Sequence, residues 1–213
     1  MRSIPLTLVA LSLALPAIAQ DHDADRAIAG GGKLAEGWMA RTDRGQDFSN
    51  VRFEETATGW EVSVGPAVVF YRDEDVAHGS YTISADFEQL SSKGHAHGVG
   101  LVFGGADLQG EGQAYTYVLV RGDGNYLVKT RTGSETAYLT QWTEHAAVNQ
   151  SAEGHVTNTL AVRVTPEDVI FMLNGQEVHR EKAADVYTDG IVGFRMNHNV
   201  DMRVHNFKIE RSD

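Results

Sequence analysis

The sequence predicts an all-β fold, a jelly-roll sandwich in which two antiparallel sheets pack face to face. Three observations indicate this class. From residue 60 onward, apolar and polar residues alternate with a period of two. The alternating runs are rich in β-branched and aromatic residues, and turn residues separate them. Helical periodicity is nearly absent, and its best candidate, residues 135–150, is interpreted as a strand edge followed by a loop.

Ten runs carry the strand pattern, at residues 60–64, 67–71, 80–90, 99–105, 114–121, 125–130, 159–165, 168–174, 190–196 and 200–210. Two connections are predicted to be two-residue hairpin turns, because Asp123-Gly124 and Asn174-Gly175 are dipeptides that adopt positive φ angles. Trp38 and Trp60 lie beside the first predicted strands and are assigned to packing.

The N-terminal region is expected to direct export. Residues 1–20 have one basic residue, an apolar run and the small-residue site Ala17-Ile18-Ala19, a pattern typical of a cleavable signal peptide. The apolar run is too short for a transmembrane helix. Residues 21–47 are expected to be a flexible leader, and residues 48–213 a single β-sandwich domain. The protein is therefore expected in the periplasm or outside the cell.

The overall composition excludes several function classes. The chain has 29 acidic residues against 18 lysines and arginines, for a net charge of −11, which argues against nucleic acid as a partner. It has no cysteine, which excludes thiol catalysis, thiolate metal sites and disulfides. Any metal would need histidine, carboxylate or carbonyl ligands.

Several motifs follow one another in a characteristic order. They are the strands Gly79–Leu90 and Gly98–Gly105, the hairpin Tyr115–Tyr126, and the runs Asn158–Val162, Phe171–Val178, Asp189–Arg195 and Val204–Ile209. This order resembles the concanavalin A-like lectin/glucanase superfamily. Within it, the chain is similar to bacterial laminin-G-like and 3-keto-disaccharide-hydrolase-like exported domains. The resemblance covers about residues 48–210. It implies a sandwich that binds or cleaves polysaccharides on one sheet, and in many members a structural calcium.

One departure from that superfamily weakens the case for hydrolysis. Its family 16 glycoside hydrolases carry Glu-x-Asp-x-x-Glu on one strand, and this chain has no such triplet. The acidic groups Glu54-Glu55 and Asp73-Glu74-Asp75 lack the spacing. Glycosidases need two carboxyl groups held across the scissile bond, so only a pair distant in sequence would serve.

A pair of histidines raises the question of a metal site. His95 and His97 are two residues apart and would point to the same face of a strand, as two zinc ligands do. His198 is the third candidate metal ligand, and a divalent ion, calcium or zinc, is the cofactor that such residues would hold. The favoured interpretation is that these histidines are polar residues lining a cleft for a neutral ligand.

The residues expected to bind a ligand combine aromatic rings with planar polar groups. Alternation places Tyr115, Tyr117, Leu119 and Arg121 on one face of their strand, opposite a valine face expected in the core. Tyr117 and Trp142 are predicted to stack on a sugar, and the other candidates to donate or accept hydrogen bonds. The candidate ligand-binding residues are His95, His97, Tyr117, Arg121, Trp142, Arg195, Asn197 and His198.

Three functions are compatible with these residues. The favoured one is an exported domain that binds a glycan or another extracellular small ligand without catalysis. The second is a sugar-acting hydrolase of the 3-keto-disaccharide-hydrolase-like type, with His97, His198, Glu144 or Asp201 as general base, with or without a metal. The third is a structural or partner-binding protein of the envelope. The sequence specifies no oligomeric state.

Overall fold

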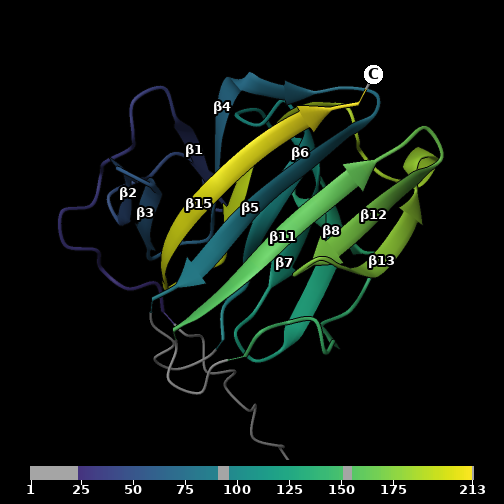
Figure 1. Ribbon diagram of the computed structural model, residues 1–213. Helices are drawn as coiled ribbons and strands as arrows, with labels where there is room; N and C mark the ends of the chain where they lie inside the picture. The colour runs from purple at the N-terminus through teal and green to yellow at the C-terminus, as the bar shows by residue number, and fades with distance from the viewer. Residues whose placement is uncertain (1–23, 91–95, 151–154, 213) are drawn as a thin grey trace, which may run out of the picture.

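The computed structural model describes residues 24–90, 96–150 and 155–212, which form a sandwich of two antiparallel sheets (Figure 1). Within those ranges the one helical element is a short 3₁₀ turn, η1 (Ala183–Asp185). No helix in the described part of the chain could cross a bilayer.

The eight-stranded sheet contains β1 (Met39–Thr42), β4 (Val68–Ala77), β6 (Val99–Ala106), β7 (Ala114–Val120), β8 (Asn125–Thr132), β9 (Glu135–Tyr138), β10 (Thr143–Glu144) and β14 (Gly190–Met196). Its order in the described residues is β1-β4-β14-β6-β7-β8-β10, and β9 also pairs with β8.

The seven-stranded sheet contains β2 (Val51–Thr56), β3 (Gly59–Val64), β5 (Tyr81–Gln89), β11 (Val156–Val164), β12 (Asp168–Leu173), β13 (Gln176–Lys182) and β15 (Val200–Arg211). Its order, again in the described residues, is β13-β12-β11-β5-β15-β3-β2. The last two strands return to the middle of the molecule, β14 between β4 and β6 and β15 between β5 and β3. This confirms the predicted all-β sandwich.

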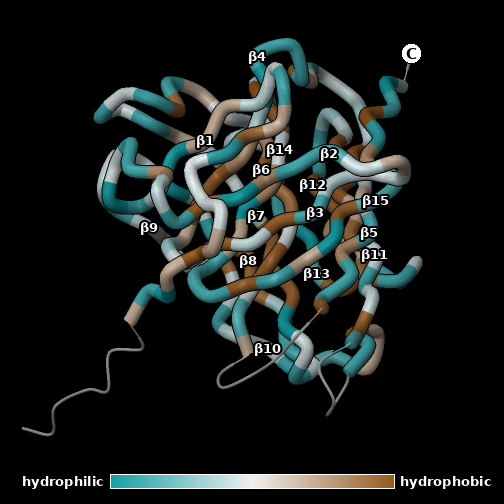
Figure 2. Tube along the Cα trace, turned by 90° about the vertical axis from the view of Figure 1, so that its left-hand side faces the viewer, coloured by the Kyte–Doolittle hydropathy of each residue, from teal (hydrophilic) through white to brown (hydrophobic). Residues whose placement is uncertain are grey.

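The hydrophobic core fills the space between the sheets because the strands alternate as the sequence predicted. In β5, Tyr81, Ile83, Ala85 and Phe87 are buried and the residues between them are not. Figure 2 shows the hydrophobic stretches along the central strands and the hydrophilic ones in the outer loops. All ten predicted runs contain an observed strand, whereas β1, β2, β10 and β13 lie outside those runs, and β9 falls in the strand edge expected within residues 135–150.

Several aromatic rings pack against one another within this core. Trp38 is 6 % exposed, and its ring stacks on Phe194 at 5.2 Å between centroids. Trp38 also meets Trp60 edge to face at 5.0 Å and lies 4.9 Å from Phe53. The packing role predicted for both tryptophans is therefore confirmed.

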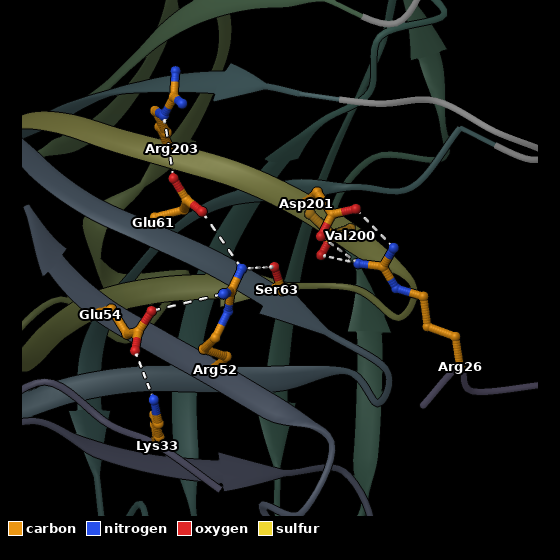
Figure 3. Close-up of polar contacts among 9 residues, drawn as sticks. All are labelled: Arg26, Lys33, Arg52, Glu54, Glu61, Ser63, Val200, Asp201 and Arg203. Carbon is orange, nitrogen blue, oxygen red and sulfur yellow. Dashed lines mark hydrogen bonds and ion pairs between the residues drawn. The ribbon is translucent and has the colours of Figure 1, made fainter. Parts of the chain in front are cut away.

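The N-terminal segment differs from the expected flexible leader over residues 21–47. Its residues 39–42 form β1, which pairs with β4, and Trp38 lies in the core. Arg26 donates from Nη1 and Nη2 to Asp201 at 2.7 and 2.6 Å and from Nη2 to the carbonyl of Val200 at 2.8 Å (Figure 3). The sandwich therefore includes residues well before position 48, because β1 completes a sheet edge and the arginine ties the segment to β15.

The two predicted hairpin turns have different geometries. Asn174 and Gly175 both have positive φ, 49° and 81°, as the two-residue turn between β12 and β13 requires. Between β7 and β8 the connection spans four residues, and only Gly124 of the predicted dipeptide has a positive φ, 93°. The two-residue turn predicted at Asp123-Gly124 is thus wrong in type, although the hairpin itself forms.

The outer face of the seven-stranded sheet carries charged side chains paired across neighbouring strands. Glu54 lies between Lys33, at 3.3 Å, and Arg52, at 3.8 Å (Figure 3). Glu61 lies between Arg52, at 3.4 Å, and Arg203, at 3.6 Å. Acidic and basic groups alternate along this ladder, so each charge has an opposite neighbour.

Candidate functional site

The strand register gathers most of the predicted ligand-binding residues on the outer face of the eight-stranded sheet or at its edge. Tyr115 and Tyr117 of β7 lie opposite Arg131 and Lys129 of β8. Cross-strand partners point to the same face, so the two cations flank the two tyrosines. Arg195 reaches this face from β14, two strands away across β6.

An apolar layer covers the middle of that face. We call it the outer cluster; it consists of Val69, Tyr71, Val102, Leu108, Tyr115, Tyr117, Leu119 and Leu127. Tyr117 is only 4 % exposed, and burial raises its pKa to about 12. Its ring lies 5.4 Å from the guanidinium of Arg195. Tyr117 therefore packs against Arg195, and its burial leaves no ring face exposed for the sugar stacking predicted for it.

Arg195 is a buried cation with one carboxylate partner. Its side chain is 7 % exposed, and Nη1 and Nη2 donate to Asp43 at 3.0 and 2.7 Å. Nη1 also donates to the Tyr115 hydroxyl at 3.3 Å, whereas the buried Nε has no hydrogen-bond partner. Burial alone would lower the pKa of Arg195, but Tyr115 and Asp43 raise it above its ordinary value. The guanidinium therefore stays charged.

Two further cations stand beside Arg195. Arg131 contacts the same Asp43 at 3.3 Å and donates from Nε to the carbonyl of Gly133. The ammonium of Lys129 lies 4.0 Å above the ring of Tyr138, which is 53 % exposed. The pKa of Lys129 is lowered, first by burial and then by the charges of Arg195 and Arg131. We call Lys129, Arg131 and Arg195 the cationic patch.

Trp142, Arg121 and Asn197 form a second group at the end of the same face, here called the Trp142 cluster. The guanidinium of Arg121 lies 4.1 Å from the centre of the Trp142 ring and also pairs with Asp123 at 2.7 Å. A Cβ on Gly98 would lie 2.7 Å from Trp142 Cη2 and 3.2 Å from Asn197 Nδ2. The lack of a side chain at Gly98 therefore lets the tryptophan approach the sheet.

The segment from Tyr138 to Trp142 borders this face along β8. Tyr138 is paired with Lys129, and the amides of Leu139 and Thr140 donate to the carbonyl of Val128. The segment thus places one half-buried and one exposed aromatic side chain at the margin of the outer cluster.

His97 and His198 meet at the same end of the sheet. Their rings are 4.5 Å apart and nearly perpendicular, and His198 Nδ1 lies 3.6 Å from Asp25. Both histidines lie just outside the strands of the eight-stranded sheet, His97 before β6 and His198 after β14. His95 lies outside the described residues.

The described residues do not fit the metal that the histidines suggested. Zinc takes three or four protein ligands. Among the residues that the structure describes, no group of three or more histidine, aspartate or glutamate side chains could hold a metal ion. This part of the chain therefore supplies no set of three such side chains for zinc, and calcium, which also takes carbonyl oxygens, stays a prediction.

The two candidate catalytic carboxylates lie on different sheets. Glu144 is exposed on β10, at the edge of the eight-stranded sheet opposite Asn125. Asp201 follows buried Val200 on β15 and is paired with Arg26 on the outer side of the other sheet. Glu144 and Asp201 therefore do not face each other across one site, as the two carboxyl groups of a glycosidase do. Asp201 is also held in an ion pair with Arg26, whereas a general base must be available to accept a proton.

Sequence reasoning missed Asp43, Lys129, Arg131 and Tyr138. Alternation within residues 125–130 carries a weak signal, because Lys129 shares a face with Leu127. Asp43 has no such signal, since it lies 152 positions from Arg195 in a segment expected to be flexible.

Comparisons with known proteins place the fold without naming a family. No family model matches the chain, and no curated protein matches it. Two solved structures from Bacillus subtilis have a TM-score of 0.59 and 12 % identity. The carbohydrate-binding module CBM66 is matched over 83 % of this chain and 98 % of its own. A protein of unknown function with a galectin-like fold is matched over 82 % and 89 %.

A third neighbour is the GH16 protein of the Bacteroides ovatus mixed-linkage glucan locus, in complex with a G4G4G3G product. It has a TM-score of 0.54 and 10 % identity, over 81 % of this chain and 94 % of its own. This chain has a jelly-roll fold. At 10–12 % identity these neighbours show the fold alone, so the predicted resemblance to the concanavalin A-like superfamily and to its laminin-G-like and 3-keto-disaccharide-hydrolase-like domains stays a prediction.

Proposed function

We propose that this chain is an exported, non-catalytic domain that binds a carbohydrate on the outer face of the eight-stranded sheet. The observation that carries the proposal is the grouping of Tyr138 and the Trp142 cluster along one margin of that face. Sugars present apolar C–H surfaces and hydroxyl groups together. Aromatic rings beside planar donors match both.

Each group of residues has a distinct role in the proposed site. Tyr138 and Trp142 supply aromatic surface, and Arg121 and Asn197 supply hydrogen bonds to hydroxyl groups. Arg195 and Tyr117 are buried and hold the surface residues in place rather than contacting sugar. The histidine pair lies at the neighbouring strand ends.

Binding is favoured over hydrolysis by the positions of the carboxylates. Asp201 is paired with Arg26, and Glu144 lies at the edge of the other sheet. Export to the periplasm or medium remains part of the proposal and rests on the signal-peptide pattern of residues 1–20.

The test is calorimetric titration of the mature protein with neutral and acidic oligosaccharides, alongside an assay for new reducing ends. We expect binding without turnover, and at least a tenfold loss of affinity in Trp142→Ala or Tyr138→Ala, the size of a lost aromatic contact of about 1.4 kcal/mol. Arg203→Ala, on the outer face of the other sheet, is the control and should bind normally. Turnover, or affinity unchanged in both aromatic variants, would overturn the proposal.

A further inference from the structure

The cationic patch is built differently from an ordinary surface ion-pair cluster. Among the described residues, Arg195 and Arg131 share a single carboxylate, Asp43. Lys129 lies close enough to both arginines for their charges to lower its pKa. The patch therefore holds three cations, and Asp43, which pairs with the two arginines, is the one carboxylate in its described ion pairs. The buried Nε of Arg195 adds a donor without an acceptor.

The cationic patch is positive, whereas the molecule as a whole is negative. The chain carries a net charge of −11, so the average field at its surface repels anions. The three neighbouring cations repel one another, and Asp43 offsets only part of that repulsion. An anion bound beside Lys129 and Arg131 would relieve the rest.

The aromatic neighbours restrict what that anion is. Lys129 is held above the exposed ring of Tyr138, and Trp142 lies four residues further along the same segment. A ligand that reaches the ammonium therefore also passes aromatic surface. A planar carboxylate attached to a sugar ring matches this combination, since guanidinium and ammonium donors bind carboxylates with short charge-assisted hydrogen bonds.

We infer that the ligand is an acidic glycan, with the carboxylate of a uronic acid residue bound by Lys129 and Arg131 at the edge of the Asp43–Arg195 pair. This inference rests on the proposed function and adds the chemical class of the sugar. Arg195 is a positioning residue in it, because its buried guanidinium orients Asp43 and contributes positive potential without touching the sugar.

The experiment compares three probes by calorimetry: oligogalacturonates, the same oligosaccharides with their carboxyl groups reduced to alcohols, and sulfated neutral oligosaccharides. We expect the oligogalacturonates to bind at least tenfold more tightly than their reduced counterparts, and the preference to weaken as salt is added. Lys129→Gln and Arg131→Gln should each remove most of that preference. Lys208→Gln makes the same charge change at an exposed position on β15 of the other sheet and should keep the preference.

The possible results distinguish the uronic acid inference from the proposed function, carbohydrate binding. Equal binding of the acidic and reduced oligosaccharides would overturn the uronate assignment and leave carbohydrate binding intact. Tighter binding of the sulfated probe would also overturn it, in favour of a sulfate ester. Failure of every oligosaccharide to bind would overturn both proposals. Thermal unfolding of each variant checks that lost binding is not lost folding.

Discussion

The outer faces of the two sheets carry their charged residues differently. On the seven-stranded sheet, Glu54 and Glu61 alternate with basic residues in an exposed ladder. On the eight-stranded sheet, Arg195 is buried and shares Asp43 with Arg131. Exposed pairs contribute little to stability because water and salt screen them, whereas a buried charge that loses its partner is costly. Removing a charge should therefore change stability little on the seven-stranded sheet and considerably on the eight-stranded sheet.

The largest effect should come from breaking the buried pair. Asp43→Asn leaves Arg195 buried beside a neutral amide, and we expect the free energy of unfolding to fall by about 2 kcal/mol. This is below the range for fully buried pairs because Asp43 is 39 % exposed. Glu61→Gln makes the same chemical change on the other face and should cost about 0.5 kcal/mol or less. Urea denaturation measures both, and equal losses would contradict the contrast between the faces.

A smaller effect should follow when the margin of the eight-stranded sheet is overfilled. Gly98→Ala places a methyl group 2.7 Å from Trp142 Cη2, so the ring must move. We expect a loss of about 1–2 kcal/mol and a change in tryptophan fluorescence. Gly112→Ala, in an exposed loop where the Cβ would lie 3.0 Å from the Asp107 carboxylate, should leave the fluorescence unchanged. An unshifted spectrum in Gly98→Ala would show that Trp142 does not pack against this glycine.

The smallest effect should appear as a dependence on pH. Burial tends to raise the pKa of Asp43, but Arg195, followed by Arg131 and Arg41, lowers it below its usual range. A carboxyl with a lowered pKa in the folded state stabilises the protein above its unfolded pKa of about 3.9, and this contribution is lost as the pH falls toward the folded value. The stability difference between the wild type and Asp43→Asn should therefore shrink below about pH 4. A difference that stays constant down to pH 2 (roughly the lower limit of such carboxyl pKa values) would contradict the pairing.

The sequence by itself determined the strands and the residues that share a face. Period-two alternation depends only on the geometry of an extended chain, so Tyr115, Tyr117 and Leu119 could be placed together before any partner strand was known. Asn174-Gly175 likewise has a local cause, because positive φ angles are a property of the dipeptide.

Only the tertiary structure decided which residues meet across the chain. Arg195 finds Asp43 from 152 positions away, and Arg26 finds Asp201 from 175. Those pairings depend on strand order and register. The sequence around each of these residues does not predict which distant residue it will meet. The same packing buries Tyr117 and assembles three cations on an acidic protein. Alternation predicts that residues share a face, but burial of that face follows only from the segments that fold over it.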